Sequence, residues 1–310
     1  MSHPTPVGPV GPAVPAGPAV PAAASNTGIL VVRPGYGATV QDLGRPGLAA
    51  LGVGRSGAAD PDALRLANRL VGNPEGAAGL EAPMGGVELE FRATTTCALV
   101  GADCPAHAAG RPVDGRTPFT VPAGARLRLG TPARGLRVYL AVRGGLDVPA
   151  ELGSRATDTI AGLGPERLTA GRLLPVGRAA TGWPATDLAP PPATPGRTVL
   201  HVVPGPRDDW FTADALHTLL TAPYTVTSDS DRVGMRLDGP ALARARGGEL
   251  PSEGMVAGAL QVPPGGRPIL FLADHPVTGG YPVIAVVRRP DLGAAAQARP
   301  GDTLHFRLDG

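Results

Sequence analysis

The stretch that decides the fold class is "VELEFRATTTCALVGA", residues 87–102. Its first five residues alternate between apolar and acidic side chains, which is the period of a strand with one buried face. An apolar run at 97–102 follows a short polar break, and further strands are predicted at 125–130 and 136–145. Short strands at this spacing, separated by Gly and Pro, are typical of a β-sandwich or a β-barrel.

The composition extends this interpretation to the whole chain. Of 310 residues, 45 are Gly and 37 are Pro, and helix interiors tolerate neither residue. We therefore expect a mainly β fold, that is, a β-rich α+β class with a few short helices. The length allows two domains, each with its own core.

Four segments follow from the distribution of residues along the chain. Residues 1–27 carry Pro at every third position from Pro9 to Pro21, which is the polyproline II period, and predict a disordered tail. A Pro-, Ala- and Thr-rich linker is predicted at 179–197. It separates an N-terminal domain at 28–178 from a C-terminal domain at 198–310.

One helix is predicted with particular clarity inside residues 56–82. Asp60 is a good N-cap and Pro61 a good first residue, and apolar residues then recur at helical spacing until Gly72. In the C-terminal domain the pattern predicts a second helix, several strands and the loops between them. The helix is placed at 207–220 and strands at 198–205 and 281–287, whereas 224–239 and 267–274 are each expected to be strand and loop.

Charge and residue usage exclude several classes of function. All 28 basic residues are Arg, so no lysine exists for a P-loop, a Schiff base or covalently bound biotin. The net charge of +2 without a basic stripe argues against nucleic-acid binding, and no apolar run is long enough to span a membrane. Cys97 and Cys104 make no disulfide framework, so we expect reduced thiols and a cytoplasmic location.

Polar side chains gather in "ADHPVTGGYPVIAVV", residues 273–287, where two glycines precede a buried strand. Gly279 and Gly280 let a ligand approach the backbone closely. Asp274 and Tyr281 lie at the ends of predicted strands, which places them at one edge of a sheet. The alternative is a hairpin whose polar groups satisfy only the backbone of the turn.

Four further stretches carry polar side chains that suit a binding site. They are 33–47 with Gln41 and Arg45, 143–158 with Ser154 and Arg155, 224–239 with Asp231 and Arg232, and 249–266 with Ser252, Glu253 and Gln261. The alternative for each is a solvated loop with local ion pairs. No GxSxG, Ser-x-x-Lys or HExxH pattern is present, and no His pair has metal-ligand spacing. The remaining possibilities for catalysis are positioning of the substrate and electrostatic stabilisation by Arg, Asp, Gln and backbone N–H groups.

Taken together and in order, these motifs resemble one family. The motifs are "VQDLGRPG", "SGAADPDALRLANRLVGNPE", "GGLDVPAELGSRATD", "SDSDRVGMRL", "SEGMVAGALQVPPGG" and "TGGYPVIAVV". The chain is identified over about 28–308 as a member of the biotin-dependent carboxyltransferase-like proteins, also called allophanate hydrolase subunit 2. This family includes the C subunit of the bacterial ATP-dependent 5-oxoprolinase and the carboxyltransferase region of urea carboxylase.

The resemblance implies a fold, a reaction and partners. It implies two linked cyclophilin-like β-barrel domains and an enzyme component that acts with 5-oxoprolinase subunits A and B. The complex would open the small-molecule substrate 5-oxo-L-proline to L-glutamate while hydrolysing ATP. ATP and Mg²⁺ would thus be cofactors of the whole complex. The lactam oxygen would be phosphorylated before water attacks the activated carbon.

The resemblance also assigns roles to the motif residues, which we expect to face a common cavity. By type, Arg45, Arg155 and Arg232 suit a carboxylate or developing negative charge. We predict Asp231, Arg232 and Asp274 as catalytic residues, and no metal ligand. The predicted substrate-binding residues are Gln41, Arg45, Ser154, Arg155, Ser252, Glu253, Gln261, Thr278, Gly279, Gly280 and Tyr281.

Two alternatives to the 5-oxoprolinase hypothesis stay open. One is a biotin-dependent carboxyltransferase, related to urea carboxylase, that uses biotin on a separate carrier protein. The other is a non-catalytic regulator that binds a partner similar to the B subunit of 5-oxoprolinase. The chain departs from the family at Pro276 and Val277, where Gln-Thr is usual, so two side-chain hydrogen-bonding groups are absent at this place.

Overall fold

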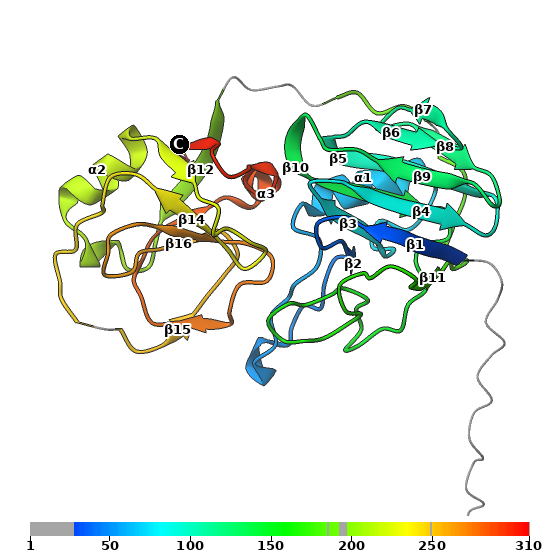
Figure 1. Ribbon diagram of the computed structural model, residues 1–310. Helices are drawn as coiled ribbons and strands as arrows, with labels where there is room; N and C mark the ends of the chain where they lie inside the picture. The colour runs from blue at the N-terminus through cyan, green and yellow to red at the C-terminus, as the bar shows by residue number, and fades with distance from the viewer. Residues whose placement is uncertain (1–27, 185, 192–196, 249, 310) are drawn as a thin grey trace, which may run out of the picture.

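The computed structural model describes residues 28–184, 186–191, 197–248 and 250–309, and it forms two halves that lie side by side (Figure 1). The predicted tail at 1–27 lies outside these residues, as do 185 and 192–196 of the predicted linker. The fold is mainly β, as predicted. Within the described residues, no helix is long and apolar enough to cross a membrane.

The first half is a sandwich of two sheets. The six-stranded sheet has the order β11 (Leu173–Pro175), β1 (Gly28–Pro34), β4 (Val87–Phe91), β9 (Arg126–Leu129), β6 (Ala106–Ala108) and β7 (Arg111–Val113). The five-stranded sheet has the order β2 (Thr39–Gln41), β3 (Gly79–Pro83), β10 (Arg134–Val142), β5 (Thr95–Asp103) and β8 (Pro118–Val121). Alternation along β4 turns Val87, Leu89 and Phe91 into the core between the sheets, where they meet Leu99 and Leu140.

Helix α1 (Pro61–Leu70) covers the outer face of the five-stranded sheet. Its predicted start is confirmed, because the Asp60 carboxylate accepts the backbone N–H of Ala63 at 3.0 Å and Pro61 is the first residue. Leu64 and Leu70 pack against Val100 and other outward side chains of β5 and β10. The helix therefore gives this sheet two buried faces.

The second half is a closed barrel with the strand order β12, β19, β16, β17, β14, β13 and β20. The strands are β12 (Thr198–Pro204), β13 (Tyr224–Val226), β14 (Gly234–Asp238), β16 (Ala259–Gln261), β17 (Ile269–Phe271), β19 (Val283–Val287) and β20 (Thr303–Leu308). In the part of the chain that the structure describes, β12 and β20 are the one pair of strands that run parallel. Among the described residues this is the one closed barrel; the expected first barrel is instead two packed sheets, because β7, β8, β11 and β2 end as unpaired edges.

Short elements complete the second half. The predicted helix at 207–220 is divided into η2 (Asp208–Trp210) and α2 (Ala213–Thr221), because Phe211 and Thr212 between them are extended. Strands β15 (Glu253–Gly254) and β18 (Thr278–Gly279) pair with each other outside the barrel. The remaining elements are η1 (Ala49–Leu51), η3 (Arg289–Asp291) and α3 (Leu292–Gln297).

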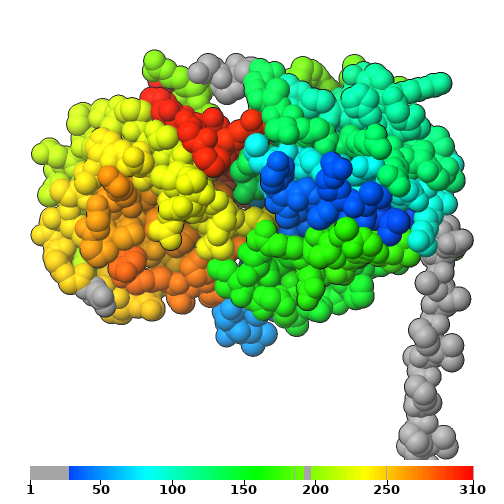
Figure 2. Space-filling view, viewed as in Figure 1, coloured from blue at the N-terminus to red at the C-terminus, as the bar shows by residue number. Residues whose placement is uncertain are grey.

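Helix α3 joins the two halves, and Figures 1 and 2 show it between the barrel and β10. The side-chain oxygen of Gln297 accepts the backbone N–H groups of Leu136 and Arg137 at 3.0 and 2.9 Å. Its side-chain nitrogen donates to Asp60 at 2.9 Å, and Arg137 donates to the carbonyl of Ala296. These contacts fix the barrel against β10 and the start of α1.

Candidate functional site

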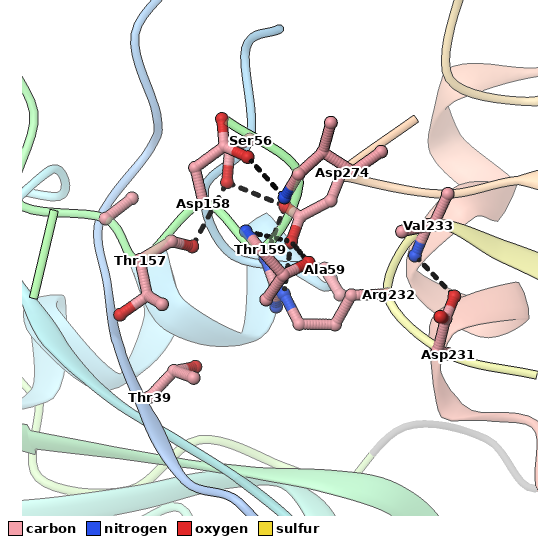
Figure 3. A network of polar contacts seen from close by, with 12 residues as sticks. Thr39, Ser56, Ala59, Thr157, Asp158, Thr159, Asp231, Arg232, Val233 and Asp274 are labelled. Carbon is pink, nitrogen blue, oxygen red and sulfur yellow. Dashed lines mark hydrogen bonds and ion pairs between the residues drawn. The ribbon is translucent and has the colours of Figure 1, made fainter. Parts of the chain in front are cut away.

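A buried ion-pair cluster crosses from the barrel to the first half. The interdomain cluster consists of Ser56, Glu81, Thr159, Arg232 and Asp274, and Figure 3 labels all of these except Glu81. Arg232 precedes β14 and Asp274 follows β17. Because these strands are antiparallel neighbours, both residues lie at the same barrel end, and the N–H of Asp274 donates to the carbonyl of Arg232 at 3.0 Å.

The carboxylate of Asp274 is fully occupied by donors from both halves. Arg232 donates from Nε and Nη2, each at 3.1 Å, which is the bidentate geometry of a guanidinium and a carboxylate. Ser56 donates at 2.6 Å, and Thr159 donates through its hydroxyl at 2.7 Å and its N–H at 3.2 Å. Only 2% of Asp274 is exposed. A carboxylate with all its acceptor sites used holds its neighbours in place.

Glu81 is the second carboxylate of the interdomain cluster, and it lies in β3 with 1% exposure. It accepts from Arg232 Nη1, from the hydroxyl of Tyr139 at 2.7 Å and from the N–H of Ala59 at 3.0 Å. Arg137 Nε lies 3.5 Å from it. Two carboxylates and two guanidinium groups therefore share this buried region, which balances their charges.

The pKa shifts in the cluster reflect this balance. Burial alone would raise the pKa of Asp274, but the Arg232 guanidinium and the hydrogen bonds from Ser56 and Thr159 lower it below its ordinary value. Burial likewise opposes ionisation of Glu81, yet Arg232 and Arg137 lower the pKa of Glu81. Burial would lower the pKa of Arg232, whereas Glu81 and Asp274 raise it. All three groups are therefore charged at neutral pH.

Asp231, predicted beside Arg232 as a catalytic residue, lies away from this cluster. Its exposed carboxylate accepts the N–H groups of Val233 and Gly234 at 2.8 and 3.1 Å, as Figure 3 shows for Val233. The chain bends at 232–233 before β14, so Asp231 stays exposed to solvent, whereas Arg232 is buried against Glu81 of the first half. A catalytic role for Asp231, Arg232 or Asp274 stays a prediction.

The predicted residues of 33–47 and 143–158 pack against one another in the first half. Gln41 donates to the carbonyl of Thr157 at 3.0 Å, and Arg45 donates to the carbonyl of Ala156 at 2.6 Å. The next two residues of this segment are Asp158, which lies 3.4 Å from Arg45, and Thr159 of the interdomain cluster. These buried contacts hold the loop that presents Thr159 to Asp274.

Ser154 and Arg155 add to the contacts between segments 33–47 and 143–158. Asp42 accepts the Ser154 hydroxyl and the Arg155 N–H, both at 2.6 Å. The Arg155 guanidinium turns outward to Asp147 at 2.8 Å and the carbonyl of Val148 at 2.8 Å. These two residues therefore anchor loops of the first half.

The remaining predicted residues form a second, more open site on the barrel. The barrel rim, as we name it, consists of Arg207, Arg244, Glu253, Gln261 and Tyr281. Strand β19 is antiparallel to both β12 and β16, so the start of β19 lies beside the ends of the other two strands. The polar residues that follow β12, end β16 and precede β19 consequently meet.

Side-chain contacts tie the barrel rim together. Arg207 Nε donates to both oxygens of Glu253 at 2.9 and 3.1 Å, and Gln261 donates to the carbonyl of Tyr281 at 3.1 Å. The Arg244 guanidinium lies 5.8 Å from the centre of the Tyr281 ring, which is 38% exposed. The hydrogen bonds from Arg207 lower the pKa of Glu253, so Glu253 is an ionised acceptor.

The neighbours of the rim include the other predicted substrate-binding residues. Ser252 is exposed just before β15, and Thr278 and Gly279 form β18, which pairs with Glu253 and Gly254. A Cβ at Gly279 would lie 2.6 Å from the Gln261 amide nitrogen, so a side chain there would displace the Gln261 amide. Gly280 follows and is half-buried.

The predicted residues are thus divided between two sites, which lie at opposite ends of β17, and do not face one common cavity. Segments 33–47, 143–158 and 224–239 lead to the interdomain cluster, and 249–266 leads to the barrel rim. The segment 273–287 connects them, because it carries both Asp274 and Tyr281. Two cavities of about 450 and 370 Å³ lie elsewhere, beside His107 and Trp183. In the described part of the chain, no three His, Cys, Asp or Glu side chains gather to hold a metal.

Several residues of these sites were missed from the sequence. Glu81 carried a usable signal, since a carboxylate inside the apolar strand "GLEAP" calls for a buried partner. Ser56 and Thr159 gave no such signal, because short hydroxyl residues are common in loops. Arg207 and Arg244 were two among 28 arginines, and only the folded barrel brings them to one rim.

Comparison with known proteins identifies a matching protein family and several similar proteins. Residues 51–308 match the family model described as carboxyltransferase domain, subdomain A and B. The C subunit of 5-oxoprolinase from Escherichia coli (strain K12) is 37% identical over 279 residues, which cover 89% of this chain and 89% of that protein.

Solved structures share the fold over most of the chain. A crystal structure of TTHA0988 superposes with a TM-score of 0.83 at 38% identity, over 93% of this chain and 57% of that chain. This chain thus spans just over half of that protein. The K. lactis urea amidolyase superposes with a TM-score of 0.85 at 30% identity, over 91% of this chain and 19% of that chain.

Proposed function

Because the chain belongs to the family of carboxyltransferase domains with subdomains A and B, we propose that it is the C subunit of an ATP-dependent 5-oxoprolinase. The observation that carries the proposal is the mutual coverage of 89% with a relative that bears this name. The likeness to the urea amidolyase is confined to 19% of that longer chain. We also propose that the two halves are cyclophilin-like domains.

The proposed reaction converts 5-oxo-L-proline, ATP and water into L-glutamate, ADP and phosphate. ATP phosphorylates the lactam oxygen, a first water attacks the activated carbon, and the C–N bond breaks to give the amine and an acyl phosphate. A second water then hydrolyses the acyl phosphate to the carboxylate of glutamate and free phosphate. We place ATP and Mg²⁺ at the level of a complex with subunits A and B. This chain brings no lysine to a phosphate group, so its own contribution rests on Arg, carboxylate, amide and backbone donors.

Within that reaction we assign different tasks to the two sites. Glu253 and Tyr281 of the barrel rim are partly exposed, and the ionised Glu253 suits the N–H of a lactam. The interdomain cluster is buried and saturated with protein partners. Arg232 and Asp274 then act as positioning residues, which hold the barrel and its rim in a fixed orientation.

The test is reconstitution of the complex from this chain and subunits A and B. We expect ATP-dependent release of glutamate from 5-oxo-L-proline, measured by a coupled glutamate dehydrogenase assay. Omission of this chain serves as the control and should abolish the release. An equal rate without this chain contradicts the proposal.

A second candidate function is favoured by the fold shared with the urea amidolyase, at a TM-score of 0.85. It is carboxyl transfer from biotin that is bound to a separate carrier protein. Formation of a carboxylated product that depends on a biotinylated carrier and on this chain would support it. Glutamate release without biotin would favour the first function.

A further inference from the structure

The three arginines predicted to hold an anionic group are already engaged by protein atoms. Arg232 is bound by Asp274 and Glu81, and the buried Arg45 is bound by Asp158 and the carbonyl of Ala156. Arg155 contacts Asp147 and the carbonyl of Val148. None of the three therefore presents an uncompensated charge at the barrel rim.

Arg244 differs from these arginines, because it has no carboxylate partner among the described residues. It is half-buried at the rim, where Nη2 donates to the carbonyl of Val262. Its Nε is buried and makes no hydrogen bond to any described residue. A partly desolvated guanidinium without a counter-ion is costly, and an anionic ligand would remove that cost.

The surroundings of Arg244 define the charge of this ligand. Arg207 and Glu253 form an ion pair that is neutral as a unit. Counted over the described residues, Arg244 then leaves the rim with a single uncompensated positive charge. A monoanion such as a carboxylate matches this charge, whereas a phosphate group with two negative charges does not.

We propose that Arg244 binds the carboxylate of the substrate, which is thus a small amide or lactam that carries one carboxylate group. The inference rests on the proposed function for the identity of the ligand. The partly exposed Tyr281 ring lies 5.8 Å from the Arg244 guanidinium, which is within the range of a cation–π contact. A Cβ at the preceding Gly280 would meet only the Leu250 carbonyl, at 3.5 Å.

The experiment measures binding rather than turnover, so its result is independent of the 5-oxoprolinase assay. The full chain is titrated with 5-oxo-L-proline and with 2-pyrrolidinone, the same lactam without the carboxylate, by ligand-observed NMR. The variants are Arg244→Gln, Arg244→Lys and the matched control Arg246→Gln. Arg246 lies two residues away, is exposed, and pairs with Asp209. Inorganic phosphate is the competitor.

Wild type and Arg246→Gln are expected to bind 5-oxo-L-proline about 10- to 100-fold more tightly than 2-pyrrolidinone. Arg244→Gln should bind the two lactams equally, and Arg244→Lys should retain part of the preference because it keeps the charge. Unchanged urea unfolding midpoints show that the variants are folded. Any one of three results overturns the proposal. Wild type and Arg244→Gln bind 5-oxo-L-proline equally, wild type binds neither lactam, or equimolar phosphate displaces 5-oxo-L-proline from wild type.

Discussion

Replacement of Asp274 by Ala should separate the positioning role of the interdomain cluster from the surface role of Asp231. The Asp274 carboxylate accepts five hydrogen bonds, from Arg232, Ser56 and Thr159. Its loss leaves these donors without a partner and leaves Arg232 with one carboxylate, Glu81. Removing one partner of a buried ion pair costs about 3–5 kcal/mol in the free energy of unfolding.

The matched control is Asp231→Ala, which removes the same side chain from an exposed position. Asp231 accepts only two backbone N–H groups, which water can reach after the substitution, so the expected loss is below about 1 kcal/mol. Urea unfolding followed by the fluorescence of Trp210, which packs at the edge of the barrel core, measures both variants.

The two midpoints should differ clearly. With a denaturant slope of about 3 kcal/mol per molar urea for a chain of this size, Asp274→Ala should lower the midpoint by roughly 1–1.7 M. Asp231→Ala should lower it by less than about 0.3 M. A midpoint of Asp274→Ala within about 0.3 M of wild type, which is no more than the shift expected of the exposed control, refutes the reasoning.

Three further predictions concern acid stability, the barrel rim and helix α3. The pKa values of Asp274 and Glu81 are lowered on folding, so their stabilisation is present above the unfolded values of 3.8 and 4.5 and is lost as the pH falls below them. Asp274→Asn should make the unfolding midpoint fall less steeply as the pH is lowered. The same pH dependence in Asp274→Asn and wild type would contradict this prediction. Gly279→Ala should weaken binding of 5-oxo-L-proline at least about tenfold, because the new Cβ meets Gln261 and Met255, whereas Gly254→Ala on the paired strand meets nothing and should bind normally. Gln297→Ala removes four hydrogen bonds and leaves the N–H groups of Leu136 and Arg137 unpaired. Urea unfolding should therefore show that the free energy of unfolding falls by about 1–3 kcal/mol. A decrease below about 0.5 kcal/mol, the scale of an ordinary surface substitution, contradicts the role of α3 in joining the two halves.

Local features of the fold could be predicted because their causes lie within a few residues. The start of α1 follows from Asp60 and Pro61, which act on the next turn of the chain. The alternation in 87–91 sets the buried face of β4. The closed barrel was expected from a resemblance, since strand spacing alone suits a sandwich as well as a barrel.

The site could be predicted only in part, because its contacts join residues far apart in the chain. Asp274 and Ser56 are separated by 218 positions, and Arg232 and Glu81 by 151. A single sequence does not record which distant loops meet. Motif spacing also cannot tell a buried side chain from an exposed neighbour, which is why Asp231 and Arg232 were assigned the same role.

The most direct test of the account compares the kinetics of the barrel rim with those of the interdomain cluster. The reconstituted complex is measured with this chain as wild type, Glu253→Gln or Asp274→Asn, at a temperature where all three are folded. We predict that Glu253→Gln lowers kcat/KM for 5-oxo-L-proline at least about tenfold without shifting the unfolding midpoint. Asp274→Asn should lower the midpoint and retain most of the activity. Wild-type kinetics in Glu253→Gln together with abolished turnover in folded Asp274→Asn would contradict the account.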